Sequence, residues 1–498
     1  MIDTRMIIVM SEKREAEAGR IEVGVGPPLR IGKLPKPPRA SHILGPGIVL
    51  AAMGIGMGEM IMWPRMALMW GPEVLWLALI GFTIQYFVQM EMSRWVTATG
   101  ESFFQGAARI GFRKIFSWIF FFSAPVIYFW PGWIGTAGQI LSYATGAPFG
   151  EMSWQIYAVL GVIAVLILLT ISPVVYNVIE KVMTGAIIIS TVLVIIVSLT
   201  IATPGRVFDV LRGFVSFGYW HPEMSSRLFM PFVVGSIAYA GPSGMQQIWY
   251  TLWCRDRGMG MGAHMARITG LFGKEESVPE TGSTFDPTDQ EESEKWRGWR
   301  KYCTFDAVVL FYSMSILLTF FYVLLELGAL SLDPSLIELE RTGKSLAIIA
   351  GMGDVFAHHI APWTARLFYA VAFLQIWNTG FGVYDGYARG QADLIYYNIP
   401  AARRVHLSKW YYIFLYGTLI PACAAFFIAK QPLVLVTMGT WLGAFAMATY
   451  CPILAYITRR LLPGELRPSR MHTIWLLIGT AFYWGMILYS LSIGALPK

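Results

Sequence analysis

Residues 45–70 read GPGIVLAAMGIGMGEMIMWPRMALMW, and residues 231–253 read PFVVGSIAYAGPSGMQQIWYTLW. Each stretch has the roughly 20 mostly apolar residues that cross a bilayer, yet glycine and proline interrupt both near the middle. Inside lipid, a backbone unwinds only where it is buried in protein or lines a cavity. Interrupted spans at matching positions in two halves of a chain indicate the binding site of a secondary transporter. The sequence therefore predicts a membrane protein that moves a small solute.

The composition supports a membrane protein and excludes several other classes. The mean hydropathy is +0.54, and only 14% of the residues are charged. The basic residues behind the net charge of +7 lie between the apolar stretches, so they indicate positive loops and not a nucleic-acid-binding patch. The four cysteines lack CxxC spacing, which gives no sign of a zinc site or a disulfide framework.

Eleven apolar stretches predict an all-α fold with about eleven transmembrane helices in one domain, residues 41–498. We assign residues 44–203 to a first repeat, 229–458 to a second, and 472–495 to an extra span. The eleven spans are expected near residues 44–69, 73–98, 115–146, 155–173, 178–203, 229–253, 303–329, 363–394, 408–429, 432–458 and 472–495.

Basic residues in alternate loops predict the orientation. Residues 1–40 hold eight Lys or Arg, and further basic residues follow the second, sixth, eighth and tenth spans. By the positive-inside rule, the N-terminus is then cytoplasmic and the C-terminus extracellular in the cell membrane. Residues 1–40 are expected to be a disordered cytoplasmic tail, and residues 254–301 a solvated polar loop on the same side.

Catalytic motifs are missing from the sequence. It has no GxxxxGK[ST] phosphate loop and no HExxH motif, and the GIGMG run at 54–58 lacks the GxGxxG spacing and a preceding strand. We therefore expect no enzyme and no cofactor. The expected partners are the lipid bilayer and a small ion or solute, and the oligomeric state stays open.

Several ordered motifs resemble the Nramp (natural resistance-associated macrophage protein) divalent-metal transporters. GPG at 45–47, followed by a glycine-bearing break, is similar to the family's first span. The family's break reads Asp-Pro-Gly-Asn, where this chain has Gly56-Met57-Gly58-Glu59. Further similar segments are ARIGFRK (108–114), IGTA (134–137), TGAI (184–187) and FLQIWNTGFGVYDGYARGQ (373–391). The resemblance covers about residues 44–458 and implies the LeuT-like fold, two inverted five-span repeats with sites at broken spans one and six.

The departures from the family pattern concern the metal ligands. The family's first-span Asp and Asn fall on Gly56 and Glu59, and its sixth-span Met and His fall on Gly241 and Ser243. The thioether that suits softer transition ions is therefore missing. The family's third-span acids fall on Phe129 and Gly132, so its proton coupling does not carry over either.

Glu59 is the central candidate for a binding residue, because a carboxylate at bilayer depth indicates function. An ion pair with Arg65, six residues later, is the structural alternative. Asp385 is expected either to bind substrate or to pair with Arg389, one helical turn away. The other candidates for the site or the pathway are Gly56, Gly58, Tyr239, Gly241, Ser243, Gln246, Asn378, Trp133 and Trp377.

These residues predict a pocket with one acid and several neutral oxygens. Glycines in place of Asp and Met are expected to create space, which favours a hard, hydrated divalent cation such as Mg²⁺, with Glu59 as its metal ligand. The alternatives are a monovalent or organic cation, another small solute, or a non-transporting receptor on the same fold.

Overall fold

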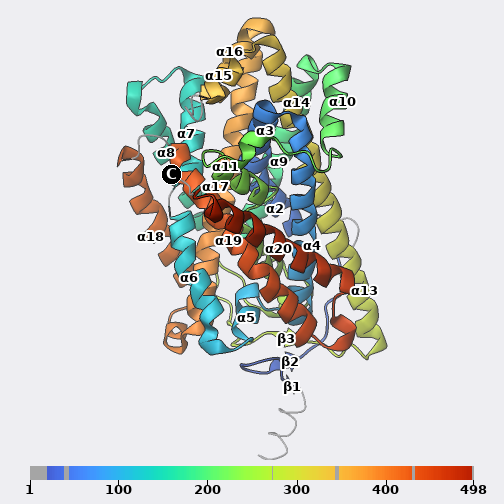
Figure 1. The fold of residues 1–498 in the computed structure, drawn as a ribbon. Helices are drawn as coiled ribbons and strands as arrows, with labels where there is room; N and C mark the ends of the chain where they lie inside the picture. The colour runs from blue at the N-terminus through green and yellow to red at the C-terminus, as the bar shows by residue number, and fades with distance from the viewer. Residues whose placement is uncertain are drawn as a thin grey trace, which may run out of the picture.

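The computed structural model describes residues 20–38, 44–129, 131–271, 273–341, 347–428 and 432–495. Long helices run roughly side by side through the molecule (Figure 1). A small sheet, the helix α5 (Phe103–Ala108) and the start of α13 (Gln290–Phe305) lie at one end, which we call the sheet end. Helices α10 (Pro204–Gly213), α15 (Leu336–Arg341) and α16 (Ala347–His359) lie at the opposite end.

Helices occupy all eleven stretches where the sequence predicts a span. Eight helical runs in the described residues are long and apolar enough to cross a membrane. The helices of the first five spans are α2–η2–α3 (Pro46–Trp70), η3–α4 (Pro72–Thr99), α6 (Ile115–Tyr128) with α7 (Gly132–Thr145), η5–α8 (Gly150–Ile171) and α9 (Val175–Ile201). Those of the last six are α11 (Met230–Ala238) with α12 (Gln246–Asp256), α13–η8–α14 (Gln290–Leu332), α17 (Pro362–Asn398), α18 (Leu407–Ile428), α19 (Pro432–Tyr456) and α20 (Arg470–Ser492).

The two glycine-rich interruptions take different forms. The first span changes from α2 (Pro46–Gly54) to a π-helix, η2 (Ile55–Met62), and continues as α3 (Trp63–Trp70). The sixth span stops at Ala238 and restarts at Gln246. Between them Gly241 and Gly244 have φ angles of 97° and 59°, in the region that side chains rarely adopt. A π-helical turn widens the first span, whereas the sixth span is truly unwound.

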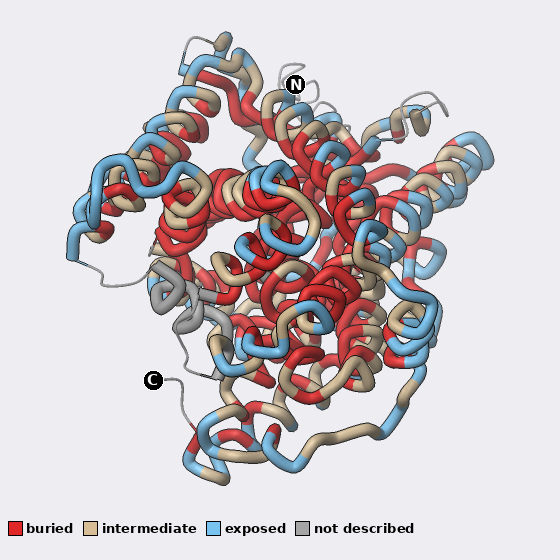
Figure 2. The backbone as a smooth tube through the Cα atoms, turned by 90° about the horizontal axis from the view of Figure 1, so that it is seen from above, coloured by how far each residue is buried: buried red, intermediate tan, exposed pale blue. Residues whose placement is uncertain are grey.

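Burial separates the core of the bundle from its rim. Seen from above, buried backbone fills the centre and exposed backbone follows the outside (Figure 2). Large apolar side chains are exposed along the outer helices, for example Ile163 and Ile167 on α8, Val192 on α9 and Ile474 on α20. Apolar surface of this extent needs a covering, and in a bundle of span-length helices a bilayer supplies it.

Residues 20–38 correct the prediction of a disordered tail. Strands β1 (Arg20–Ile21) and β2 (Leu29–Ile31) pair antiparallel, and β2 pairs in parallel with β3 (Ser283–Thr284). Leu34 is buried, and its backbone N–H donates to the Glu292 carboxylate at 2.6 Å. The apolar side chains scattered among the tail's prolines thus find partners only after the chain has folded. The rest of the predicted tail, residues 1–19 and 39–40, lies outside the described residues.

The polar segment 254–301 is also ordered, which corrects the prediction of a solvated loop. It packs Phe285, Trp296 and Trp299 inward, and α13 continues without a break into the seventh span. The remaining short helical turns are η4 (Phe112–Lys114), η6 (Pro222–Ser225), η7 (Gly260–His264), η9 (Pro400–Arg404), η10 (Ile457–Leu461) and η11 (Gly464–Leu466).

Arg109 joins the tail to this loop. Its guanidinium donates to both oxygens of Glu101, each at 2.6 Å, and also to the Val23 carbonyl at 2.8 Å and the Thr281 hydroxyl at 2.9 Å. Arg109 and Glu101 are both buried. Because a buried carboxylate left without its partner is costly, this pair holds the tail, α5 and the loop together.

We predict that Arg109→Gln loosens the tail. Breaking a buried ion pair costs about 3–5 kcal/mol, so the melting temperature should fall and amide exchange over residues 20–36 should rise. The exposed Arg30, on β2, supplies the control, since Arg30→Gln removes the same charge without touching Glu101. Equal tail protection in the Arg109 and Arg30 variants would contradict this role.

Candidate functional site

The first and sixth spans touch through glycine at the level of their interruptions. A Cβ on Gly54 would lie 2.8 Å from the carbonyl carbon of Gly241, and a Cβ on Gly58 would lie 1.9 Å from the Tyr239 carbonyl oxygen. The same Tyr239 oxygen accepts a hydrogen bond from Trp63 Nε1 at 3.3 Å. Only glycine permits this approach, and the contact fixes η2 against the end of α11.

Gly56 faces the eighth span in the same way. Its Cβ would lie 2.1 Å from Thr379 Oγ1 on α17, and that hydroxyl donates to the Met53 carbonyl at 3.0 Å. The prediction that Gly56 and Gly241 create space is therefore wrong. The Thr379 side chain and neighbouring backbone fill it at Gly56, and a Cβ on Gly241 would lie 2.7 Å from Gln85 Oε1. A pocket for a fully hydrated divalent ion does not follow from Gly56 and Gly241.

The unwound part of the sixth span is held by Tyr128 at the end of α6. Its hydroxyl donates to the Ser243 carbonyl at 3.1 Å and accepts from the Met245 N–H at 2.9 Å. The Tyr128 ring stacks on Trp133, with ring centroids 6.1 Å apart. Trp133 thus supports the break of the sixth span by packing. Ser243 Oγ and both amide atoms of Gln246 are buried and have no hydrogen bond to a described residue.

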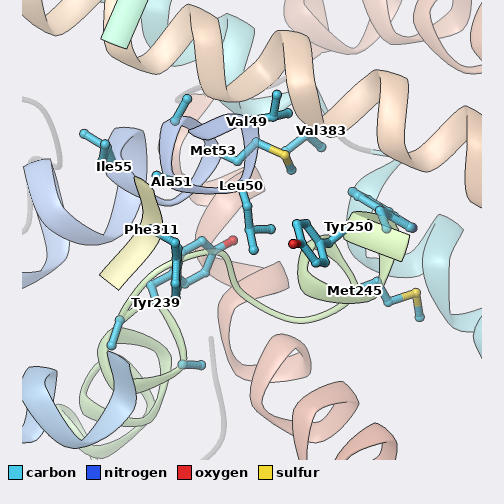
Figure 3. Packing of buried hydrophobic residues seen from close by; sticks show 14 of the residues in the cluster. Val49, Leu50, Ala51, Met53, Ile55, Tyr239, Met245, Tyr250, Phe311 and Val383 are labelled. Atoms are coloured by element: carbon cyan, nitrogen blue, oxygen red, sulfur yellow. The ribbon is translucent and has the colours of Figure 1, made fainter. Parts of the chain in front are cut away.

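Apolar side chains fill the core below the glycine contacts. Leu50 of α2 lies between the rings of Tyr239 and Phe311 on one side and that of Tyr250 on the other (Figure 3). Tyr250 donates its hydroxyl to Asp306 at 2.7 Å, and Gly47 N–H donates to the same carboxylate at 3.0 Å. On the α2 side of the interruption, Asp306 is hydrogen-bonded, and apolar side chains such as Leu50 fill the space between the helices.

Glu59 lies on η2 and is fully buried, and neither carboxylate oxygen has a hydrogen-bond partner among the described residues. The ion pair with Arg65 that the sequence allows does not form. The Arg65 guanidinium instead lies 4.4 Å from the centroid of the Phe232 ring. A lone carboxylate within a bundle of membrane spans is expensive, and such a group indicates function.

Two polar side chains lie near the Glu59 carboxylate, and a third lies beside one of them. Ser315 and Tyr322 of α14 lie within electrostatic range of it, and Tyr322 also faces Gln375 of α17. All three are buried, and the Ser315 hydroxyl, the Tyr322 hydroxyl and the Gln375 amide lack hydrogen bonds to any residue described in the structure. Together with Glu59 they offer oxygen ligands without sulfur, a set that suits a hard cation.

A cavity of about 30 Å³ lies next to this group, toward the opposite end from the sheet. This volume admits a water molecule or a small ion, since one water needs about 10–15 Å³ on this measure. Its walls include Met60 and Arg65 of the first span, Tyr322 and Glu326 of α14, and Met352 of α16. Tyr322 therefore belongs to both the cavity and the surroundings of Glu59.

Asp385, Asn378 and Trp377 all lie on α17 and make structural contacts. Asp385 pairs with Arg389 at 2.7 Å, as the one-turn spacing allowed. Asn378 Nδ2 donates to the Met183 carbonyl at 3.4 Å, and its Oδ1 has no partner among the described residues. Trp377 donates to the Gly161 carbonyl at 3.3 Å, so it packs against the fourth span.

Asp385 and Arg389 belong to a buried ion network between α12 and α17. Arg389 also pairs with Asp256, and Arg255 pairs with Asp393 at 2.5 Å. All five side chains are at most 1% exposed. Three more residues donate to its carboxylates: Trp253, Tyr411 and Ser102. This network closes the bundle next to α5, at the sheet end.

Ser315, Tyr322 and Gln375 were missed by the sequence analysis, although the sequence carried a signal for two of them. Ser315 and Tyr322 are seven residues apart, so they share one face of a helix. A serine, a tyrosine and Glu326 on one face of an otherwise apolar span are unusual. Nothing local to Gln375 distinguishes it from the neighbouring Asn378, because only packing decides which one meets Tyr322.

Comparisons with known proteins agree on the fold. No protein-family model and no curated protein matches this chain. Among solved structures, a mutant of the Eremococcus coleocola manganese transporter has a TM-score of 0.58 at 12% identity, covering 96% of this chain and 97% of that chain. The same transporter in complex with an aromatic bis-isothiourea substituted compound has a TM-score of 0.57 at 12% identity, covering 96% of this chain and 92% of that chain.

Mhp1, a nucleobase-cation-symport-1 family transporter in a closed conformation with bromovinylhydantoin bound, has a TM-score of 0.50 at 14% identity and covers 92% of each chain. At these identities the likeness concerns the fold. The chain is an all-α, multi-pass membrane protein with the LeuT-like fold.

We predict that Gly58→Ala destabilises the protein, because its methyl group would overlap the Tyr239 carbonyl. Overpacking of this kind costs about 1–3 kcal/mol, and more where backbone must move. Gly185 on α9 supplies the control, since a Cβ there meets nothing within 4 Å. Gly185→Ala should be neutral or stabilising by about 0.5–1 kcal/mol. Melting curves in detergent compare the two, and equal melting temperatures would show that the glycine contact is not required.

Proposed function

We propose that this protein is a secondary transporter that carries a small, singly charged cation, with Glu59 as the principal binding group. The observation that carries the proposal is the unpartnered, fully buried Glu59 carboxylate beside the oxygens of Ser315, Tyr322 and Gln375. One carboxylate balances one positive charge. The neutral oxygens can complete the coordination of a hard cation or accept hydrogen bonds from an ammonium group.

Charge and size favour a monovalent cation over the hydrated Mg²⁺ expected from the sequence. Mg²⁺ dehydrates reluctantly and keeps several waters, so it needs room. The positions expected to provide this room are Gly56, which contacts Thr379, and Gly241, which contacts Gln85 and Phe311. The cavity of about 30 Å³ beside Tyr322 suits a small ion and not a larger organic solute.

The basic residues of the loops support an orientation with the sheet end in the cytoplasm and the C-terminus outside the cell. In this orientation the small cavity faces the extracellular side, and the ion network around Arg389 and Asp393 closes the cytoplasmic side. An alternating-access transporter in this state would receive its ion from outside.

We predict that Glu59→Gln abolishes cation uptake and leaves the fold intact. The amide keeps the size of the side chain but loses the charge, and a neutral amide is cheaper to bury than a carboxylate. Radiolabelled Na⁺, Rb⁺ or methylammonium added outside proteoliposomes measures the uptake, and a melting curve on the same preparation measures the stability.

The matched control is Glu338→Gln, which removes an exposed charge on α15. It should leave uptake unchanged. Normal uptake by a stable Glu59→Gln protein would remove Glu59 from the site. Uptake of none of the three cations by the unmodified protein would favour the alternatives, another small solute or a receptor that does not transport.

We predict that Mn²⁺ does not bind tightly. The chain has Gly56 and Gly241 where the Nramp family has a carboxylate and a thioether ligand, and groups of three or more potential metal ligands are missing from the described residues. Calorimetric titration of the purified protein with Mn²⁺ should give no micromolar binding. A micromolar site that Glu59→Gln removes would instead support a transition-metal cargo.

A further inference from the structure

The seventh span carries a polar face that points toward Glu59. Ser315, Thr319, Tyr322 and Glu326 are spaced by four, three and four residues on α14 (Met314–Leu332), so they form one stripe along the helix. Thr319 donates its hydroxyl to the Ser315 carbonyl at 2.8 Å. The stripe is exceptional in a helix that is otherwise made mostly of Leu, Phe and Val.

This stripe joins the cavity to Glu59. Tyr322 and Glu326 line the cavity, one helical turn apart. Tyr322 faces Gln375 and Glu59, and Ser315 lies beside Glu59 two turns further along the helix. Polar groups thus follow one another without interruption from the cavity to the buried carboxylate.

Hydrogen bonding differs sharply between the two sides of Glu59. Toward the sheet end, Asp306 accepts hydrogen bonds from Gly47 N–H, the Tyr250 hydroxyl and Gln89. Toward the cavity, the hydroxyls of Ser315 and Tyr322 have no hydrogen-bond partner among the residues that the structure describes. A buried hydroxyl without a partner costs free energy. An ion or its water in the cavity can satisfy the hydroxyls of Ser315 and Tyr322.

We infer that the polar face of α14 is the access route by which the cation reaches Glu59 from the cavity, with Tyr322 as the last ligand passed before the site. This inference rests on the proposed function and adds the route and two further residues that determine cation affinity. As the ion leaves the cavity, the Tyr322 hydroxyl oxygen replaces one of its water ligands. Ser315 then supplies a neutral oxygen ligand beside the Glu59 carboxylate.

The test compares Tyr322→Phe and Ser315→Ala with a matched control on the same span. Tyr312 belongs to η8 (Asp306–Ser313), and its hydroxyl lies 3.2 Å from the Thr83 hydroxyl, facing the second span. Tyr312→Phe therefore removes a hydroxyl away from the route. Proteoliposome uptake of radiolabelled Na⁺, Rb⁺ and methylammonium gives KM and kcat for each variant, and melting curves report the folding.

Tyr322→Phe and Ser315→Ala should each raise the KM of the transported cation at least about tenfold, the scale of one hydrogen bond or contact to a charge. The melting temperatures should not fall, because each change removes a buried hydroxyl that lacks a partner. Tyr312→Phe should leave the KM unchanged.

A second measurement locates the route. Met60→Cys places a thiol on the wall of the cavity, next to Glu59. Cys254, Cys303 and Cys451 are buried, and the half-buried Cys423 is replaced by Ser in this background. A positively charged methanethiosulfonate reagent should then block uptake, and the transported cation should slow the reaction.

The outcomes separate the inference from the proposed function. If Glu59→Gln abolishes uptake but Tyr322→Phe and Ser315→Ala behave like Tyr312→Phe, the route is wrong and the proposed function stands. Unhindered uptake after complete modification of Met60→Cys would also overturn the route. If the unmodified protein takes up none of the three cations, the proposed function itself fails.

Discussion

The close contact between the first and sixth spans is the constraint on which the rest of the structure depends. Gly58 lies so near the Tyr239 carbonyl, and Gly54 so near Gly241, that no side chain fits between the two backbones. This contact needs no charge and no hydrogen bond of its own. It fixes the position of η2 along the unwound segment of the sixth span. This position places Glu59, which lies on η2, next to α14 and α17. A wider separation would leave Glu59 without its oxygen-bearing neighbours.

Among the described residues, Glu59 has no ion pair and no hydrogen bond of the kind that usually stabilises a buried carboxylate. Two other buried carboxylates in the bundle do have such contacts. Asp393 has Arg255 and Ser102, and Asp306 has Tyr250 and the Gly47 N–H. Because a single absent partner costs several kcal/mol within a membrane, the bare Glu59 carboxylate supports the proposed cation site.

The two ends of the molecule follow different physical rules. The sheet end is closed by ion pairs, by Arg109 and by the ordered tail, all of which must separate before the bundle can open there. The opposite end is closed by apolar side chains around a small cavity, with Arg65 and Glu326 on its wall. Buried ion pairs hold the helices of the sheet end in one geometry, because separating a pair would leave a buried charge without its partner at a high cost in free energy.

The sequence by itself determined the spans and the place of the two interruptions, and it singled out Glu59 as a candidate. Long apolar runs are a local property, and a carboxylate in such a run is conspicuous.

Only the tertiary structure decided the structural role of the glycines. The sequence predicts space at Gly56 and Gly241, but contacts with Thr379 at the first and with Gln85 and Phe311 at the second turn it into tight packing. The tertiary structure also decided that Ser315 and Tyr322 lie near Glu59, that Gln375 lies beside Tyr322, and that residues 20–38 are ordered. Each of these depends on side chains far apart in the chain, and their meeting is fixed by packing and not by local pattern.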